Sequence, residues 1–417
     1  MTTGLREIAR IFLRIGLVSF GGPAAQIALM HRELVERRGW MTEPEYLRAL
    51  SFCMLLPGPE AMQLATYSGW KRRGTLGGLI AGLLFVQPGA MVVLALSILY
   101  VTLGATAVAQ ALMLGVKAAV ASIVLQALIR VARRALRGRS DYLIATLAFL
   151  ALFLFAIPFP MAIAIAALWG WLSGRGQIIE GDLNAAPQLS ATLRTIAVWA
   201  AIWLLPLIAL WLVEDGILTR IGVYFAQLAT LTFGGAYAIL GWMTQTVVAD
   251  FGWLTAGQMI DALGLAETTP GPLILVTEFV GFLAAYREGG IVLGIAGAVV
   301  TLWMTFVPSF LFIFAGAPWL EHLTQRPALQ SALAAITAAV VGVIANLTIW
   351  FAAHVFFAEV PSISIGPVVV IAPVLDSAQP VAVLLAIAAG LLLIWRQWPL
   401  PLVLLISALA SWAISAA

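Results

Sequence analysis

The tripeptide Pro-Gly-Pro occurs twice, at Pro57–Pro59 and at Pro270–Pro272, and both copies interrupt apolar stretches. A backbone break at membrane depth leaves amide and carbonyl groups that hydrocarbon cannot bond, so such breaks occur only where protein or a water-filled cavity lines them. Proline suits the start of a helix because it has no N–H to lose there, so we expect a half-helix to begin at Pro59 or Glu60. The free amides and dipole of such a helix end can bind an anion.

Hydroxyl and amide side chains surround both breaks, and their donors suit a tetrahedral oxyanion stripped of water. They are Ser19, Gln26, Gln63 and Thr66 in the first half of the chain, and Thr232, Tyr237, Thr268, Thr269 and Thr277 in the second. The alternative is hydrogen bonding between helices, which is common in membrane bundles. The sequence leaves both roles open.

Four ionisable residues stand in or beside apolar segments, where such residues are costly and mark functional sites. Lys117 lies within "ALMLGVKAAVASIVLQAL" and either adds positive charge to an anion pathway or pairs with a carboxylate. Glu60, Glu267 and Glu278 follow or precede a break, and an ionised carboxylate there would repel an anion. We therefore expect them to carry protons or to pair with Lys117, while Glu60 could equally cap its helix.

The residue types that support catalysis or metal binding are scarce. Cys53 is the only cysteine, and the three histidines, His31, His322 and His354, lack paired ligand spacing. We expect no metal, no cofactor and no enzymatic activity, because no nucleophile and base stand together.

The composition predicts an all-α polytopic membrane protein. Of the 417 residues, 62% are hydrophobic and only 10% are charged, and apolar runs of spanning length recur throughout. The formal charge of +3 comes from arginine-rich loops, so membrane topology explains it better than nucleic-acid binding does.

The chain also contains an internal duplication. Phe20–Gly22 recurs at Phe233–Gly235, and the two Pro-Gly-Pro copies are separated by the same offset in sequence. From Phe20 to Pro59, 14 of 40 positions are identical to their counterparts at that offset, which is too many for shared hydrophobicity alone. We expect residues 1–173 to form the first membrane repeat, 174–221 a polar loop and a linking span, and 222–417 the second repeat.

Loop charges predict that the two repeats are inverted. The first repeat has arginine-rich loops around Arg37, Lys71 and Arg134, which the positive-inside rule assigns to the cytoplasm, whereas the matching loops of the second repeat are nearly bare. A segment between two cytoplasmic loops cannot cross fully. We therefore expect about four full spans and two broken or re-entrant segments per repeat, joined by one extra span, although full crossing of the broken segments stays open.

Inversion would bring the two half-helix ends together near the membrane midplane from opposite leaflets. The residues expected to bind substrate there are Ser19, Gly21, Gly22, Pro57, Gly58, Pro59, Gln63, Thr232, Gly234, Gly235, Thr268, Thr269, Pro270, Gly271 and Pro272, with Lys117.

Four longer motifs make the chain resemble the chromate ion transporter (CHR) family, in its long two-domain branch. They are "SFGGP" at Ser19, "LLPGPEAMQLATYSGW" at Leu55, "LTFGGAYA" at Leu231 and "LAETTPGPLILVTEFVGFLAAY" at Leu265. The resemblance implies an inner-membrane transporter that exports chromate, confers chromate resistance and is coupled to protons as an antiporter.

Residues and resemblance together predict a secondary transporter for a tetrahedral oxyanion, chromate first, working by alternating access. A carrier for sulfate or another anion and an anion channel are the alternatives. The sequence permits a homodimer.

Overall fold

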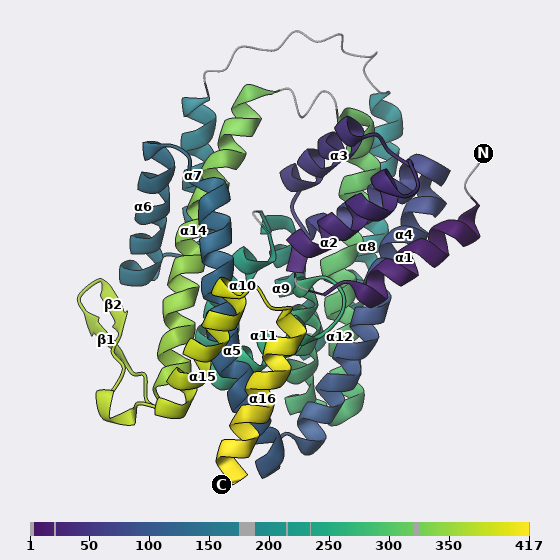
Figure 1. The fold of residues 1–417 in the computed structure, drawn as a ribbon. Coiled ribbons are helices and arrows are strands. Elements are labelled where there is room, and N and C mark those ends of the chain that lie inside the picture. Colours follow the sequence, from purple (N-terminus) through teal and green to yellow (C-terminus); the bar gives the residue numbers. More distant parts are fainter. Residues whose placement is uncertain are drawn as a thin grey trace. The chain divides into compact units, whose positions relative to one another are not determined.

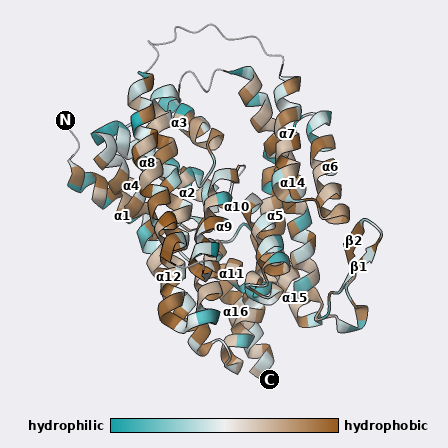
Figure 2. Ribbon diagram, turned by 180° about the vertical axis from the view of Figure 1, so that it is seen from behind, coloured by the Kyte–Doolittle hydropathy of each residue, from teal (hydrophilic) through white to brown (hydrophobic). Residues whose placement is uncertain are grey.

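A computed structural model of the chain describes residues 4–20, 22–174, 188–213, 216–233, 235–320 and 326–416 (Figure 1). Five of its helices are long and apolar enough to cross a membrane by length and composition: Glu60–Leu103, Ala107–Ala135, Leu189–Val213, Leu273–Trp319 and Pro327–Phe356. Hydrophobic residues dominate the long helices α8 and α12 in Figure 2. The architecture confirms the predicted all-α polytopic membrane protein.

The chain divides into two compact units, and each takes segments from both halves of the sequence. The first unit lies within Met1–Ile98, Gly176–Ala236 and Thr269–Gln330. Its elements are α1 (Leu5–Val18), α2 (Gly22–His31), the π-helical turn η1 (Arg32–Glu36), α3 (Glu43–Leu55), most of α4 (Glu60–Leu103), α8 (Leu189–Val213), α9 (Ile217–Leu231), the 3₁₀ turn η3 (Leu273–Leu275), α12 (Val276–Gly316) and η4 (Ala317–Trp319).

Helices α4 and α12 each fold back on themselves. A straight helix of 44 residues would measure roughly 66 Å, about twice the hydrocarbon thickness of a bilayer. In α4, Arg73 and Gly74 have non-helical backbone angles, and a Cβ on Gly69 would collide with the carbonyl oxygen of Gly77. In α12, Gly289 and Gly290 make the corresponding kink. Each helix is therefore an antiparallel hairpin of two helices.

Ion pairs join the two ends of the broken segments near the N-terminus. Glu45 in the first turn of α3 lies 2.7 Å from Lys71, which is at the end of the first helical stretch of α4. Glu7 in α1 lies 3.3 Å from Arg38, which follows η1. In each case the two paired residues flank a broken segment. The Glu7–Arg38 pair flanks the break around Phe20, and the Glu45–Lys71 pair flanks the break at Pro57–Pro59.

The second unit lies within Leu99–Arg175, Tyr237–Thr268 and Ser331–Ala417. It contains α5 (Ala107–Ala135), α6 (Arg139–Phe155), α7 (Phe159–Ser173), most of α10 (Ala236–Thr244), the π turn η2 (Gln245–Asp250), α11 (Ala256–Thr268), most of α14 (Pro327–Phe356), η5 (Leu375–Ser377), α15 (Pro380–Gly390), the π turn η6 (Leu391–Trp395) and α16 (Leu400–Ala416).

Glycines allow the long helices of the second unit to pack closely against helices from the other half of the sequence. A Cβ on Gly115 of α5 would collide with the Ser407 carbonyl of α16, and one on Gly342 of α14 would collide with the Ala145 carbonyl of α6. Such small residues allow close backbone approach in membrane bundles. Helix α5 also packs on α15 through Ala118, Leu385 and Ala386.

One short β-hairpin departs from the all-helical expectation. Strand β1 (Ser362–Ile365) pairs antiparallel with β2 (Val368–Ile371) across a two-residue turn. Gly366 has a φ of +60° there, which glycine adopts without steric cost. The apolar loop between α14 and α15 therefore forms local hydrogen bonds that periodicity alone does not predict.

Helix boundaries recur in register with the duplication found in the sequence. Helix α3 (Glu43–Leu55) and helix α11 (Ala256–Thr268) match at both ends, at the offset that separates the two Pro-Gly-Pro copies. Helices α6 and α15 also begin at corresponding places, Arg139 and Pro380, once insertions in the second half are allowed for. The inversion and the number of full spans per repeat stay predictions, since α6, α7, α15 and α16 have 17 residues or fewer.

Candidate functional site

The first break places Gly58 in a conformation that suits glycine. Its φ is +114°, and its N–H donates to the Thr232 carbonyl at 2.9 Å. Helix α4 then begins at Glu60, as the sequence predicts. The N–H of Gln63 donates to the Pro59 carbonyl at 3.0 Å, so the amides of Ala61 and Met62 have no helix carbonyl one turn earlier. The first turn of α4 is thus a potential anion-binding helix end.

The second break repeats this arrangement with the partners exchanged. Gly271 has a φ of +100°, and its N–H donates to the Ser19 carbonyl at 2.9 Å. Because Thr232 is the repeat counterpart of Ser19, as Gly271 is of Gly58, the two bonds form a reciprocal pair inside the first unit. Each Pro-Gly-Pro break is held by the Phe-Gly-Gly break of the other half of the chain.

The helices that continue after the breaks start differently. Helix α4 follows the first break directly, whereas η3 intervenes between Pro272 and α12. The carbonyl of Gly271 also accepts a hydrogen bond from Gln26 Nε2 at 2.6 Å. The second break is therefore held at both its N–H and its C=O.

Buried polar atoms without hydrogen-bond partners gather at the first break. Gln63 donates from Nε2 to the Pro57 carbonyl at 2.6 Å, but its Oε1 accepts nothing. A Cβ built on Gly58 would lie 2.8 Å from Gln63 Nε2 and 3.0 Å from Ser309 Oγ, and Ser309 Oγ is buried without a partner. Leaving such groups unpaired costs free energy, so they mark a place where a polar ligand would be stabilised.

Several threonine hydroxyls predicted to bind substrate are instead bonded within their own helices. Thr232 donates to the Leu228 carbonyl, Thr268 to Leu265 at 2.7 Å and Thr277 to Ile274 at 2.7 Å. A hydroxyl has a single proton to donate, so these side chains do not offer a free donor in this conformation. Ser19 differs, because its buried Oγ has no partner.

The carboxylates beside the breaks belong to different units. Glu60 is half-buried, and its Oε1 would lie 3.5 Å from a Cβ built on Gly235. Glu278 is buried in α12, and its Oε2 has no partner. Glu267, in the second unit, accepts a hydrogen bond from the Tyr237 hydroxyl at 2.7 Å.

Lys117 is paired with a carboxylate inside the second unit. Its Nζ lies 3.2 Å from Asp261 Oδ1, and the Tyr100 hydroxyl donates to Asp261 Oδ2 at 2.8 Å. Of the two roles that the sequence leaves open for Lys117, this geometry favours pairing with a carboxylate over adding positive charge to an anion pathway. The ion pair and the Tyr100 hydrogen bond offset part of the cost of burying the Asp261 charge.

The first unit brings most of the predicted substrate-binding residues into one compact body. They are Ser19, Gly22, Pro57, Gly58, Pro59, Gln63, Thr232, Gly235, Thr269, Pro270, Gly271 and Pro272. Thr268 and Lys117 belong to the second unit, and Gly21 and Gly234 lie outside the described residues.

Sequence reasoning missed Ser309 and Asp261. Ser309 follows Pro308 in an apolar helix and carries no motif signal. Asp261 was detectable as an acid within the apolar stretch "AGQMIDALGLAET". Among the described residues, no three His, Cys, Asp or Glu side chains could hold a metal ion together.

The model of one protein family, described as chromate transporter, matches residues 6–171 and 219–412. A chromate transport protein of Pseudomonas aeruginosa is 34% identical over 367 residues, covering 85% of this chain and 82% of that protein. One of Cupriavidus metallidurans is 31% identical over 361 residues, covering 84% and 82%. A probable chromate transport protein of Synechococcus elongatus is 30% identical over 349 residues, covering 83% and 84%. No solved structure matches the chain.

Proposed function

The chain belongs to the chromate transporter family, and we propose that it is a secondary active transporter that exports a tetrahedral oxyanion, chromate in the first place. The substrate binds at the first Pro-Gly-Pro break, between the first turn of α4 and the buried side chains of Gln63 and Ser309. The single observation that carries this proposal is the buried, unpaired Ser309 hydroxyl against Gly58, just before the first turn of α4.

The chemistry of the break suits an oxyanion. The amides of the first turn of α4 and the Ser309 hydroxyl can donate hydrogen bonds, and the helix dipole favours negative charge. Gln63 Nε2 has a second proton besides the one it donates to the Pro57 carbonyl, and this proton can be donated to the anion. No buried arginine is needed.

The reciprocal bonds between the breaks support alternating access. They tie a break from each half of the chain into one unit, and inverted repeats that meet at a broken-helix site are the usual architecture of secondary transporters.

In the proposed topology the protein lies in the inner membrane, with the arginine-rich loops of residues 1–173 in the cytoplasm. Protons couple transport through Glu60, Glu267 or Glu278.

Uptake of labelled chromate into inverted vesicles tests the site. Replacing Ser309 by Ala removes a donor without adding bulk, and we expect the KM for chromate to rise roughly tenfold, the loss expected for one hydrogen bond to a charged group. Ser97→Ala is the matched control, because the Ser97 hydroxyl is also buried but donates to the Val93 carbonyl of its own helix. Equal KM values for both variants and the native protein would place the site elsewhere.

The same vesicles distinguish the alternatives. Chromate exporters should show saturable uptake that sulfate inhibits weakly and that a proton uncoupler abolishes. Stronger inhibition by sulfate than by unlabelled chromate would reassign the substrate. Flux that ignores the uncoupler and rises linearly with concentration would indicate an anion channel.

A further inference from the structure

Helix α1 has the residue pattern of a helix that lies along a membrane surface. Ile8, Ile11, Phe12 and Ile15 are buried on one face, while Arg6, Arg10 and Arg14 repeat every four residues on another. Leu13 and Leu17 are 40% and 53% exposed. Basic residues next to exposed leucines are typical of helices that rest at the boundary of headgroups and acyl chains.

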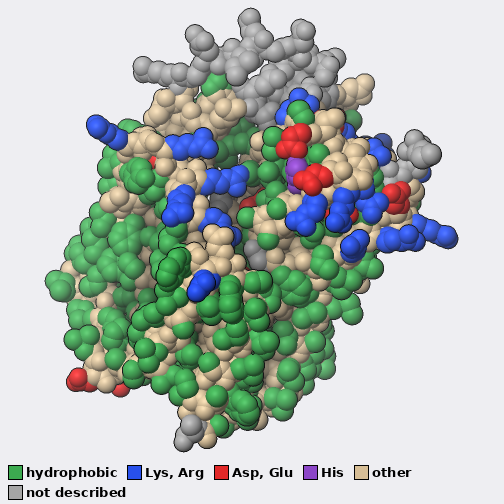
Figure 3. Space-filling model, viewed as in Figure 1, with side chains coloured by type: hydrophobic (Ala, Val, Ile, Leu, Met, Phe, Trp, Pro, Cys, Tyr) green, Lys and Arg blue, Asp and Glu red, His purple; other side chains and the backbone are tan. Residues whose placement is uncertain are grey.

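A cavity of about 220 Å³ opens beside this helix, within the first unit. Its charged lining consists of Arg10, Arg14, Arg32, Glu33, Arg37 and Arg38. Its apolar lining comes from α1 and α2, through Ile11, Ile15, Val18 and Leu29. Figure 3 shows Lys and Arg side chains gathered on the surface over α1 to α3.

Only part of the positive charge in this cavity is neutralised. Arg37 lies 2.5 Å from Glu33, and Arg38 lies 3.3 Å from Glu7 and 3.7 Å from Glu33. Among the described residues, no carboxylate lies within 4.0 Å of the guanidinium groups of Arg10, Arg14 or Arg32. Three arginines without counter-charges therefore converge on an apolar hollow.

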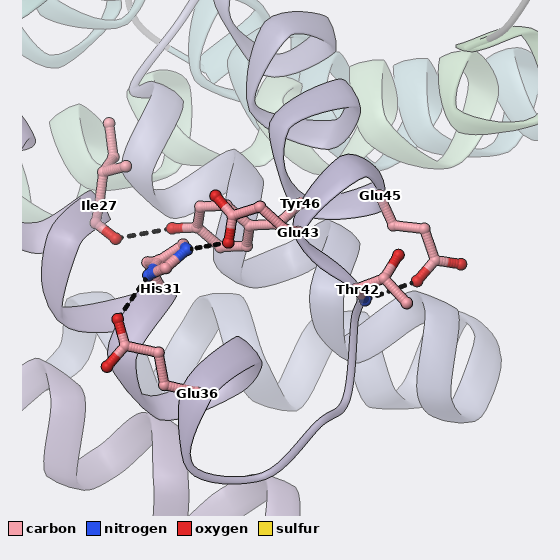
Figure 4. Close-up of polar contacts among 7 residues, drawn as sticks. All are labelled: Ile27, His31, Glu36, Thr42, Glu43, Glu45 and Tyr46. Carbon is pink, nitrogen blue, oxygen red and sulfur yellow. Dashed lines mark hydrogen bonds and ion pairs between the residues drawn. The ribbon is translucent and has the colours of Figure 1, made fainter.

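Hydrogen bonds of His31 and Tyr46 join α2 to α3 and to the turn between them (Figure 4). His31 bonds Glu36 at 3.1 Å and Glu43 at 2.5 Å, and the hydrogen bond to Glu43 raises the pKa of His31 above its usual value. Tyr46 donates to the Ile27 carbonyl at 2.6 Å and packs edge-on against the His31 ring. Arg32 follows His31 directly and is the first residue of the π-helical turn η1.

We propose that this cavity binds the phosphate group of an anionic phospholipid from the leaflet at which α1 lies. Guanidinium groups bind phosphate oxygens in pairs, and Arg10, Arg14 and Arg32 would supply them. The acyl chains would lie along Ile15, Val18 and the exposed leucines of α1. A soluble oxyanion would gain nothing from these apolar walls, whereas a lipid buries them.

Bound lipid would also stabilise the end of α1, where the chain leads into the break around Phe20. The cavity reaches Val18, and the next residue, Ser19, accepts the hydrogen bond from Gly271. The lipid site is separate from the oxyanion site at Gly58, so it stands whether or not that site is correct.

Native mass spectrometry and thermal unfolding of the full-length protein in phosphatidylcholine nanodiscs test the proposal, with phosphatidylglycerol added. We expect phosphatidylglycerol to bind in preference and to raise the unfolding midpoint. The triple variant Arg10→Gln, Arg14→Gln, Arg32→Gln should weaken that binding on the order of a hundredfold, about fivefold for each arginine near the membrane surface. The matched control is Arg133→Gln, Arg137→Gln, Arg139→Gln, which removes the same charge from exposed positions of the second unit and should leave binding within about twofold of native.

The proposal is overturned if the two triple variants lose lipid binding equally, since the effect would then be net charge alone. It is also overturned if inorganic phosphate raises the unfolding midpoint as much as phosphatidylglycerol does, because the cavity would then hold a soluble anion. If the triple variant does not fold, the three single variants replace it. Each should weaken binding about fivefold, and unchanged binding in all three would contradict the assignment.

Discussion

At the first break, Gly58 lies against the polar ends of Gln63 and Ser309, whereas at the second break Gly271 lies against Leu275 and Gly89. The backbone is nearly the same at both, with φ values of +114° and +100° and one N–H bond of 2.9 Å each. Burial differs as well. Pro57 and Glu60 are half-buried, while every residue from Thr269 to Leu273 is buried.

The difference separates two roles that a duplicated motif would otherwise share. The second break is filled: Leu275 and Gly89 occupy the space over Gly271, and Gln26 bonds its carbonyl. Unpaired buried oxygens occur at both breaks, on Gln63 and Ser309 at the first and on Ser19 and Gln26 at the second, but only the first has a polar side chain against its glycine Cα. We infer that the first break binds substrate and that the second holds the two halves together.

The largest expected effect comes from adding one methyl group at each break. Gly58→Ala would displace both Gln63 and Ser309, so transport should fall on the order of a hundredfold, because two hydrogen bonds to a charged group contribute about 1.5–3 kcal/mol each. Gly271→Ala suffers the same backbone strain, of roughly 1–2 kcal/mol, but its Cβ meets no polar group: it would lie 2.9 Å from the movable end of Leu275 and 3.3 Å from the Gly89 Cα. Transport per folded molecule should then stay within about fivefold of native. Equal losses in both variants would contradict the division of roles.

For the residues that pack over the breaks, the substitution at the second break should lower the stability of the protein more than the substitution at the first break does. A Cβ on Gly89 would collide with the Pro270 carbonyl, so Gly89→Ala should lower the free energy of unfolding by about 1–3 kcal/mol. Ser309 occupies the equivalent place over the first break, and Ser309→Ala removes an unbonded hydroxyl at little cost. Thermal unfolding in detergent measures both variants. A less stable Ser309→Ala than Gly89→Ala would reverse the comparison.

The two breaks also differ in the residue that follows the Pro-Gly-Pro motif, which is Glu60 in the first half and Leu273 in the second. If Glu60 carries the coupling proton, Glu60→Gln should abolish the pH dependence of chromate uptake while the amount of folded protein is unchanged. A helix cap would tolerate the same change, since an amide oxygen still accepts from backbone N–H groups. Uptake that keeps the native pH profile in Glu60→Gln would assign Glu60 to capping.

The smallest effect concerns the ion pair that closes the first hairpin. Both halves have a capping side chain: Glu45 accepts from the Thr42 N–H at 2.8 Å, and Gln258 accepts from the Thr255 N–H at 3.0 Å. Only Glu45 also pairs with a lysine, Lys71. Glu45→Gln therefore keeps the cap and removes the pair, which should cost at most about 1 kcal/mol because both side chains are about one-third exposed.

The pH dependence of this cost follows from the pKa of Glu45. The hydrogen bond to Lys71, and after it the hydrogen bond from the Thr42 backbone, lower that pKa from 4.5 to about 2. The ionised Glu45 therefore stabilises the fold above about pH 4.5, and this contribution is lost as the pH falls toward 2. Unfolding midpoints of Glu45→Gln and the native protein should therefore converge in acid. Lys71→Gln is the matched control and should behave in the same way. A difference that persists at low pH would show that the cap, not the pair, had been damaged.

Local rules let the sequence determine the positions of the breaks and the membrane class. Gly58 and Gly271 both adopt positive φ, which glycine does without steric cost. Helix α4 begins at Glu60 because Pro59 has no N–H to donate to a preceding turn. The caps at Thr42 and Thr255 follow from spacing alone. Hydrophobic runs required helices, since backbone groups in hydrocarbon must be bonded within their own segment.

Only the tertiary structure decided which of these groups meet. Gly58 bonds Thr232, and Lys117 pairs with Asp261, although the members of each pair lie in opposite halves of the sequence. No local rule reaches that far, because such contacts depend on how whole helices pack rather than on neighbouring residue types. The same holds for Ser309, whose hydroxyl matters only because α12 passes beside Gly58. The sequence therefore determined that there were two similar breaks, and packing decided that polar side chains lie against Gly58 whereas Leu275 and Gly89 lie against Gly271.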